Sequence, residues 1–188
     1  STTTADAAGN VTIYRYDDQY RTTSVTYPDG HEVTRAYDAD NNLVSDENGT
    51  YTYDAHGNMT SATVDGHTTS YAYDAKSRLV QMAEPDGTVT TFNYDEAGNL
   101  AWTASNAGDT VVFTYDELGR CLSATDADGV TASFSWEGGC VTAITDGLGN
   151  TTSLAYDAMG RCVSVTDALG NTSRTSYDAA GRVVAEQD

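Results

Sequence analysis

The chain has 188 residues, and its 28 acidic residues against nine basic ones give a formal net charge of −19. This charge disfavours nucleic acids and anionic membrane surfaces as partners, because phosphate groups are bound mainly by Lys and Arg. No apolar run approaches the ~18 residues of a membrane-spanning helix, and the first residues do not resemble a signal peptide. We therefore expect neither nucleic-acid binding nor membrane insertion.

The residue content leaves two structural classes open. Leu, Ile, Val and Phe make up only about 15% of the chain, which together with the high net charge is typical of disordered proteins. The 13 tyrosines, the frequent threonines and the presence of only two prolines favour β-strands instead. An ordered β protein is thus the main alternative to disorder.

A Tyr-Asp dipeptide recurs through the chain and indicates how it is organised. Successive copies are separated by 21, 16, 20, 21, 21, 21, 20 and 21 residues, with Trp136-Glu137 filling the one gap in the series. Such spacing is the mark of a repeat architecture. We expect a single array of about nine units over residues 1–188, with units that start near Tyr16, Tyr37, Tyr53, Tyr73, Tyr94, Tyr115, Trp136, Tyr156 and Tyr177.

The unit at Tyr156 shows the pattern within a repeat: two turns of the form Asp-x-x-Gly, each followed by a short strand. In the unit at Tyr156, turns over residues 157–160 and 167–170 precede strands over 161–166 and 171–177. The Asp side chain can accept backbone N–H groups two residues on, and Gly accepts a positive φ. Asn41 can replace this Gly because Asn tolerates the left-handed conformation, whereas Tyr20 makes the first unit irregular.

Turns this short join only antiparallel strands, because a parallel crossover needs a dozen or more residues. The sequence therefore predicts an all-β protein in which β-hairpins form one continuous curved or spiralling sheet, with 162–166 antiparallel to 171–176. A three-sided parallel β-helix also has a coil of about 20 residues. It is disfavoured because each unit has two turns and not three corners.

Large side chains predict how the sheet faces are used. Positions two residues before the unit's Tyr share its face of the strand, and most carry a ring, as in Phe92-x-Tyr94. Stacked along the array, these rings form an aromatic ladder. The other strand is apolar on both faces, with Cys162 opposite Val163 and Val165, which favours a sheet coiled round on itself.

The repeated motif residues are interpreted as structural, with Tyr packing in the ladder and Asp shaping the turn. Each Arg at the position after that of the turn Gly (Arg78, Arg120, Arg161 and Arg182) is expected beside the turn acids of adjacent units, and an anion contact is the alternative. These residues are Tyr53, Asp54, Gly57, Tyr73, Asp74, Arg78, Tyr94, Asp95, Gly98, Tyr115, Asp116, Gly119, Arg120, Tyr156, Asp157, Gly160, Arg161, Tyr177, Asp178, Gly181 and Arg182.

The sequence offers no catalytic, cofactor or metal site. The acidic turns lack the ligand spacing of an EF-hand loop, and no Cys or second His stands at zinc spacing from a histidine. We expect His31, His56 and His67 to be exposed in or beside turns. The three cysteines are too few to pair fully and are expected to be small buried apolar residues: Cys121, Cys140 and Cys162.

The units YDELGRCLSATD, YDAMGRCVSVTD and YDAAGRVVAEQD closely resemble the YD repeat of the RHS family. This family includes bacterial RHS polymorphic toxins, shell components of Tc toxins, and teneurins. The resemblance implies hairpins of one long spiralling sheet that builds a hollow shell. In the bacterial members the shell encloses a C-terminal toxic segment, and in teneurins a similar barrel serves adhesion. The Pro-containing signature of the family's protease core is absent, so no protease residues are assigned.

The function predicted is therefore a non-catalytic structural segment of a YD-repeat shell that encapsulates or displays a C-terminal effector. Its partners would be the rest of its own array and that effector, in a secreted or surface bacterial protein. Because both ends fall at the second turn, without an atypical capping repeat, we expect a fragment of a longer protein. The alternative is an adhesion or carbohydrate-binding module that uses exposed aromatics such as Trp102 and Trp136.

Overall fold

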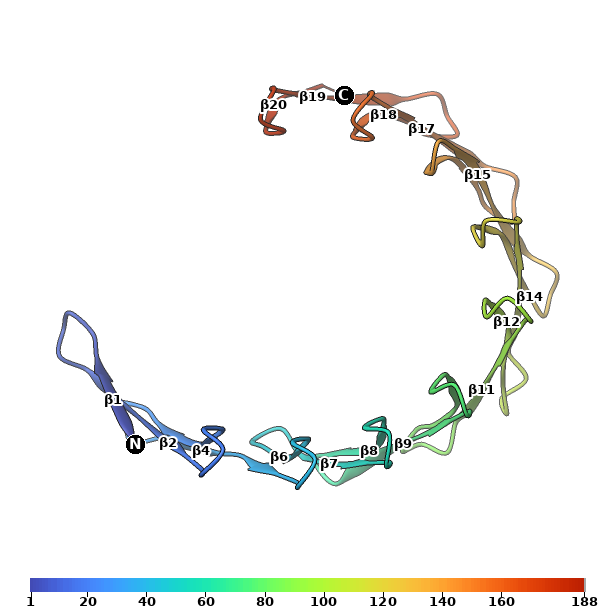
Figure 1. Ribbon diagram of the computed structural model, residues 1–188. Coiled ribbons are helices and arrows are strands. Elements are labelled where there is room, and N and C mark those ends of the chain that lie inside the picture. Colours follow the sequence, from blue (N-terminus) through green and yellow to red (C-terminus); the bar gives the residue numbers. More distant parts are fainter. Residues whose placement is uncertain (188) are drawn as a thin grey trace. The chain divides into compact units, whose positions relative to one another are not determined.

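The computed structural model describes residues 1–187 and consists of strands and turns (Figure 1). None of these residues forms a helix, and so no helix in the described part of the chain could cross a membrane. The chain divides into two compact units, Ser1–Thr91 and Phe92–Asp188. The predicted all-β class is confirmed.

The first unit holds ten complete strands that follow one another in hydrogen-bonded chain order, apart from one break. They are β1 (Thr2–Ala5), β2 (Val11–Tyr16), β3 (Thr22–Thr26), β4 (Glu32–Thr34), β5 (Ala36–Tyr37), β6 (Leu43–Ser45), β7 (Thr50–Tyr53), β8 (Met59–Val64), β9 (His67–Tyr73) and β10 (Leu79–Ala83).

Strand β11 (Val89–Tyr94) carries residues of both units, and nine further strands complete the second unit in chain order. These are β12 (Leu100–Ser105), β13 (Thr110–Tyr115), β14 (Cys121–Asp126), β15 (Thr131–Glu137), β16 (Cys140–Thr145), β17 (Thr151–Tyr156), β18 (Cys162–Thr166), β19 (Thr172–Tyr177) and β20 (Val183–Gln187).

Pairing between neighbouring strands is antiparallel, as the short turns predict. Strand β18 pairs with β19 from Ser164 opposite Arg174 to Thr166 opposite Thr172. This is the pairing expected for residues 162–166 and 171–176. The parallel β-helix is therefore wrong for this chain.

The prediction of one uninterrupted sheet needs a correction, because β1–β4 form a four-stranded sheet and β5–β20 a second one. The break falls at Arg35, between β4 and β5. Arg35 is the one charged residue in the series that stands two positions before each unit's Tyr. Its N–H donates to the Thr23 carbonyl at 2.8 Å, so this backbone group remains paired where the strand is interrupted.

The turns have the predicted chemistry. At the turn that opens with Asp157, the Gly160 N–H donates to the Asp157 carbonyl at 3.0 Å, and Gly160 has φ of 75°. Tyr20 adopts the same conformation at φ of 63°, and its N–H donates to the Asp17 carbonyl at 3.1 Å. The turn of the first repeat, at Tyr16, therefore has the regular geometry, contrary to expectation. Its backbone adopts the left-handed conformation although Tyr20 stands at the glycine position.

A β-bulge recurs at the ring of almost every unit. Tyr156 lies opposite Cys162, whereas the preceding Ala155 lies opposite Ser164, so that Val163 is an extra residue on β18. The same register shift occurs at Tyr16, Tyr37, Tyr53, Tyr73, Tyr115, Trp136 and Tyr177. A bulge interrupts the strict alternation of faces. The predicted assignment of Cys162 and Val163 to opposite faces, which assumed a regular strand, therefore does not hold at this point.

The core is thin. Among the described residues only Val25, Val33 and Ser24 are buried, and most strand residues are half-buried. Phe113 and Tyr115 are half-buried while Thr114 between them is exposed, which confirms that the rings share one face. With so little apolar burial, specific contacts between successive hairpins must carry much of the stability.

Candidate functional site

The candidate functional site is the junction between one repeat and the next, and it begins with the turn aspartate. The Asp157 Oδ1 atom accepts the N–H groups of Met159 at 2.9 Å and Arg161 at 3.0 Å. Its Oδ2 atom accepts the Arg161 Nε–H at 2.7 Å. These hydrogen bonds, with that from the Arg161 side chain the largest, lower the pKa of Asp157 below the ordinary 3.8. One carboxylate thus fixes the turn and orients the arginine.

The arginine four residues after the turn aspartate pairs with the acid of its own turn. The N···O distances are 2.6–2.8 Å in the pairs Arg21–Asp17, Arg78–Asp74, Arg120–Asp116, Arg161–Asp157 and Arg182–Asp178. The prediction that these arginines neighbour the turn acids of adjacent units holds in part, because Arg21 and Arg161 also donate to the carbonyl of the next unit's turn aspartate. The carboxylate in the same turn is closer because both groups extend from one rigid loop.

The same arginine also reaches the next repeat, through a ring and a carbonyl. The Arg161 guanidinium carbon lies 4.7 Å from the centre of the Tyr177 ring, within cation–π range. Its Nη1 group donates to the Asp178 carbonyl oxygen at 3.1 Å. The ring is therefore covered by a cation, an arrangement that a ladder of stacked rings did not anticipate.

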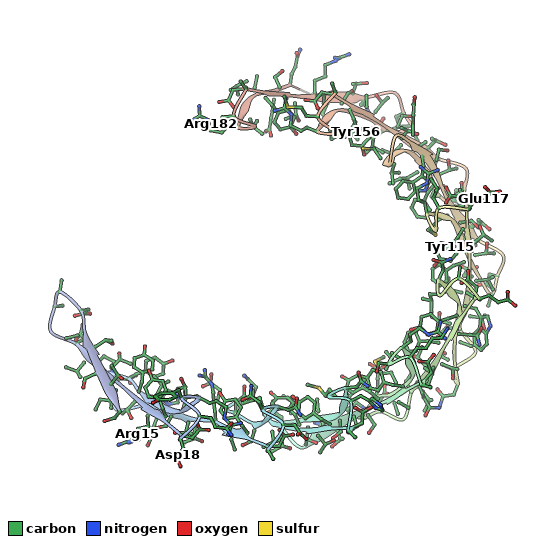
Figure 2. All side chains as sticks on the ribbon, viewed as in Figure 1. Arg15, Asp18, Tyr115, Glu117, Tyr156 and Arg182 are labelled. Atoms are coloured by element: carbon green, nitrogen blue, oxygen red, sulfur yellow. The ribbon has the colours of Figure 1, made fainter. Side chains whose placement is uncertain are left out.

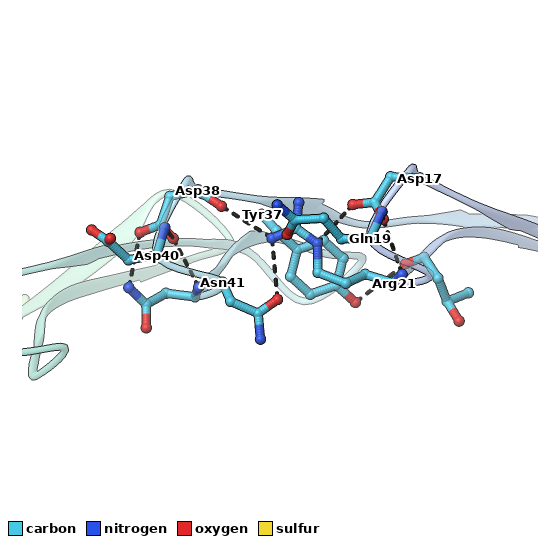
Figure 3. Close-up of polar contacts among 9 residues, drawn as sticks. Asp17, Gln19, Arg21, Tyr37, Asp38, Asp40 and Asn41 are labelled. Atoms are coloured by element: carbon cyan, nitrogen blue, oxygen red, sulfur yellow. Dashed lines mark hydrogen bonds and ion pairs between the residues drawn. The ribbon is translucent and has the colours of Figure 1, made fainter.

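Figure 3 shows this junction between the first two repeats, which begin at Tyr16 and Tyr37. Arg21 extends from the turn at Asp17 across the ring of Tyr37, at 4.7 Å from its centre. Its Nη1 group donates to the Asp38 carbonyl and to the Asn41 Oδ1 atom, both at 3.1 Å. One arginine thus ties together two successive turns and the ring between them.

The rings of seven repeats each donate a hydrogen bond back to the preceding hairpin. The Tyr177 hydroxyl donates to the Cys162 carbonyl at 2.9 Å, and Trp136 does the same through Nε1 to the Cys121 carbonyl at 2.7 Å. Equivalent bonds are Tyr37 to Thr22, Tyr53 to Leu43, Tyr73 to Met59, Tyr115 to Leu100 and Tyr156 to Val141.

The β-bulge explains why a carbonyl is available for this bond. The ladder between β18 and β19 covers only Ser164–Thr166 of β18, so Cys162 lies beyond it. A half-buried backbone carbonyl without a partner is costly, and the Tyr177 hydroxyl supplies the donor. The tyrosine therefore replaces backbone pairing at the point where the two strands separate.

Comparison with known proteins identifies the repeat. The profile of the Teneurin YD-shell family matches residues 48–188, and that of the RHS repeat matches residues 2–32. The chain belongs to the Teneurin YD-shell family. The resemblance to RHS/YD repeats read from the sequence is confirmed. A search of curated proteins gave no match.

Several solved structures share the fold of this YD-shell segment. TcdB2-TccC3 without its hypervariable C-terminal region superposes with a TM-score of 0.76 at 15% identity, covering 98% of this chain. The complex TcdB2-TccC3-Cdc42 gives 0.65 at 14% identity and 98% coverage. The Tc holotoxin pore of Photorhabdus luminescens gives 0.60 at 16% identity and 96% coverage. The YD-shell segment spans only 12–13% of the length of these chains.

Most of the sequence-predicted motif residues meet at these junctions. In each repeat of the series the Tyr ends a strand and the Asp and the Gly position lie in the turn that follows, and Arg120 and Arg161 join their turns to the next ring. Sequence reasoning missed Arg21, because the residue before it is Tyr20 and not the Gly of the motif. It also missed the hydrogen bond that Trp136 donates. The four-residue spacing from Asp17 to Arg21, identical to that from Asp157 to Arg161, could have found the first of these.

The other candidates for chemistry are the acidic and histidine side chains, the cysteines and the two tryptophans. Within residues 1–187 no group of three or more His, Cys, Asp or Glu side chains is placed to hold a metal ion. The three histidines are exposed, as predicted. The cysteines are free but half-buried and not buried, because the single-layer YD-shell sheet has little interior. Trp102 is half-buried, and the Arg120 guanidinium carbon lies 5.7 Å from the centre of the Trp136 ring.

Proposed function

We propose that this YD-shell segment is a non-catalytic piece of wall in a longer repeat array. The observation that carries the proposal is the junction itself, in which a hairpin offers a carbonyl, and in several repeats also an arginine, to the ring of the next. Such an interface can be repeated indefinitely without a change in geometry. The turn carboxylates, which in an enzyme could serve as acids or bases, are here engaged by backbone N–H groups and by Arg or Asn side chains.

The wall would enclose or display a C-terminal effector within a secreted or surface bacterial protein. Membership of the YD-shell family and the fold shared with TcdB2-TccC3 support this role. The small share of those chains that this segment spans supports the view that it is one part of a longer array. The net charge of −19 would keep such a surface soluble and discourage association between sheet edges.

Protection of the enclosed segment tests the proposal. In the longer protein that carries this array, we expect the region C-terminal to the repeats to resist a protease that digests it readily after denaturation. Arg161→Ala with Tyr177→Phe would weaken one junction and increase cleavage, whereas Arg182→Ala serves as a control in the same motif. Equal digestion of the C-terminal region before and after denaturation would refute enclosure. Saturable binding to a glycan array, lost on substitution of Trp102, would instead favour the adhesion module.

A further inference from the structure

The arginine of the junction is missing in some repeats, and a pocket opens where it would lie. Asn99 occupies the arginine position before Tyr115, and Cys140 occupies it before Tyr156, both rings being labelled in Figure 2. A pocket of 530 Å³ lies over each ring. The longer side chain of Arg161 lies over the Tyr177 ring in the equivalent place.

The pocket over Tyr115 retains the groups that hold the guanidinium elsewhere. The Tyr115 hydroxyl donates to the Leu100 carbonyl at 2.9 Å, the same length as the bond of Tyr177, so the ring is held in the same way. The Asp116 residue lines the pocket, and its carbonyl accepts the turn N–H of Gly119 at 3.0 Å. The Asp178 carbonyl accepts its own turn N–H at 3.0 Å and still takes the Arg161 guanidinium.

The charges around this pocket favour a cation. Asp95, Asp116 and Glu117 line it, while Arg120 is paired with Asp116 at 2.6 Å. Asp95 accepts the Asn99 backbone N–H at 2.8 Å and its side-chain amide at 3.0 Å, and neither donor carries a charge. Within the turn, Asp95 is thus held by the neutral Asn99, whereas the equivalent Asp157 is held by the charged Arg161. The pocket over Tyr156 has fewer acids, Glu137 and Asp157, and Asp157 is paired with Arg161.

We propose that the pocket over Tyr115, formed where Asn99 replaces arginine, binds the guanidinium group of an arginine side chain from a partner polypeptide. The planar guanidinium would lie on the Tyr115 ring and donate towards the Asp116 carbonyl and the surrounding carboxylates. Lysine fits less well, because its compact ammonium neither stacks on a ring nor donates in a planar fork. This site does not depend on the shell role, since it needs only the local geometry of two successive repeats.

The test is a titration of the intact chain with N-acetyl-arginine amide, followed through the Tyr115 ring resonances by NMR. We expect a saturable, millimolar response that weakens as salt is added, because exposed ion and cation–π contacts are modest and screened. The uncharged isostere N-acetyl-citrulline amide should give no saturable response. Tyr177, already covered by Arg161, should not respond to either compound.

Two reciprocal variants make the test decisive. Asn99→Arg places the chain's own guanidinium in the pocket and should weaken binding at Tyr115 by at least about tenfold, with unchanged Tyr177 resonances showing that the fold is kept. Arg161→Asn uncovers the Tyr177 ring and should create a new saturable response there. An equal response to the citrulline compound, undiminished binding in Asn99→Arg, or no saturation at Tyr115 would each overturn the proposal.

Discussion

The indole Nε1 of Trp136 donates to the Cys121 carbonyl at 2.7 Å, across a separation of 15 residues. The Tyr156 hydroxyl makes the same bond to the Val141 carbonyl at 2.8 Å, also 15 residues earlier. What the position requires is a flat ring with a hydrogen-bond donor at its far edge. The one departure from the Tyr-Asp pattern therefore keeps the physical function of the repeat.

This equivalence predicts how Trp136 can be replaced. Trp136→Tyr should preserve the bond to the Cys121 carbonyl. Trp136→Phe removes the donor, while both variants lose a similar area of the indole ring. The free energy of unfolding should therefore be lower in the Phe variant than in the Tyr variant by about 0.5–1.5 kcal/mol. Urea denaturation followed by circular dichroism measures the difference. Equal stability of the two variants would show that the hydrogen bond is not important.

Arg161 and Arg182 hold the same motif position in two successive repeats and so offer a matched comparison. The Arg161 side chain is 26% exposed and covers Tyr177, whereas that of Arg182, labelled in Figure 2, is 80% exposed. Arg161→Ala should lower stability, with about 0.5–1 kcal/mol coming from the lost cation–π contact. Arg182→Ala should change it little. A loss as large at Arg182 would mean that only the turn ion pair matters.

Local chemistry explains which features could be predicted from the sequence. The turn at Asp157 depends on contacts within four residues, so the Asp-x-x-Gly spacing alone indicates both the Asp side-chain bonds and the positive φ of Gly160. Antiparallel pairing follows from the same turns because they are too short for any crossover. The repeat, and the family that it resembles, depend on these local signals.

The contacts between repeats were harder to predict, because they depend on register. The Tyr177 bond to Cys162 exists only because the bulge at Val163 and the short ladder with β19 leave that carbonyl available. In strands of alternating small polar and apolar side chains, no particular residue marks the position of the bulge or the end of the ladder. The break between β4 and β5 at Arg35 likewise is not revealed by the spacing of the repeats.

Acid should destabilise the array. The Arg161 side-chain hydrogen bond lowers the pKa of Asp157, and that of Asn58 does the same for Asp54, so both titrate below the ordinary 3.8 when folded. Between the folded and unfolded pKa values the unfolded chain binds more protons. The stabilisation is therefore present above the unfolded value and is lost as the pH falls through the folded one.

Urea midpoints at about pH 7 and about pH 3 measure this loss. We expect a lower midpoint in acid, and a smaller drop for Asp157→Asn, in which the side chain at this position no longer titrates. Midpoints that do not change with pH would contradict a stabilising role for the ionised turn carboxylates.

The last prediction concerns the strained turn at Tyr20. This side chain is 89% exposed and its backbone has φ of 63°, so it supplies little packing to offset the left-handed conformation. Tyr20→Gly should raise the free energy of unfolding by up to about 1 kcal/mol, since relief of strain exceeds the added chain entropy. Gly160→Ala, at φ of 75° with nothing closer to the new Cβ than the Cys140 Sγ at 3.9 Å, should lower it by a similar amount. Gln19→Gly, in the same turn as Tyr20 but with ordinary φ, controls for flexibility and should be neutral or slightly destabilising. If Gln19→Gly and Tyr20→Gly shift the urea midpoint in the same direction, backbone conformation is not what selects glycine at the fourth turn position.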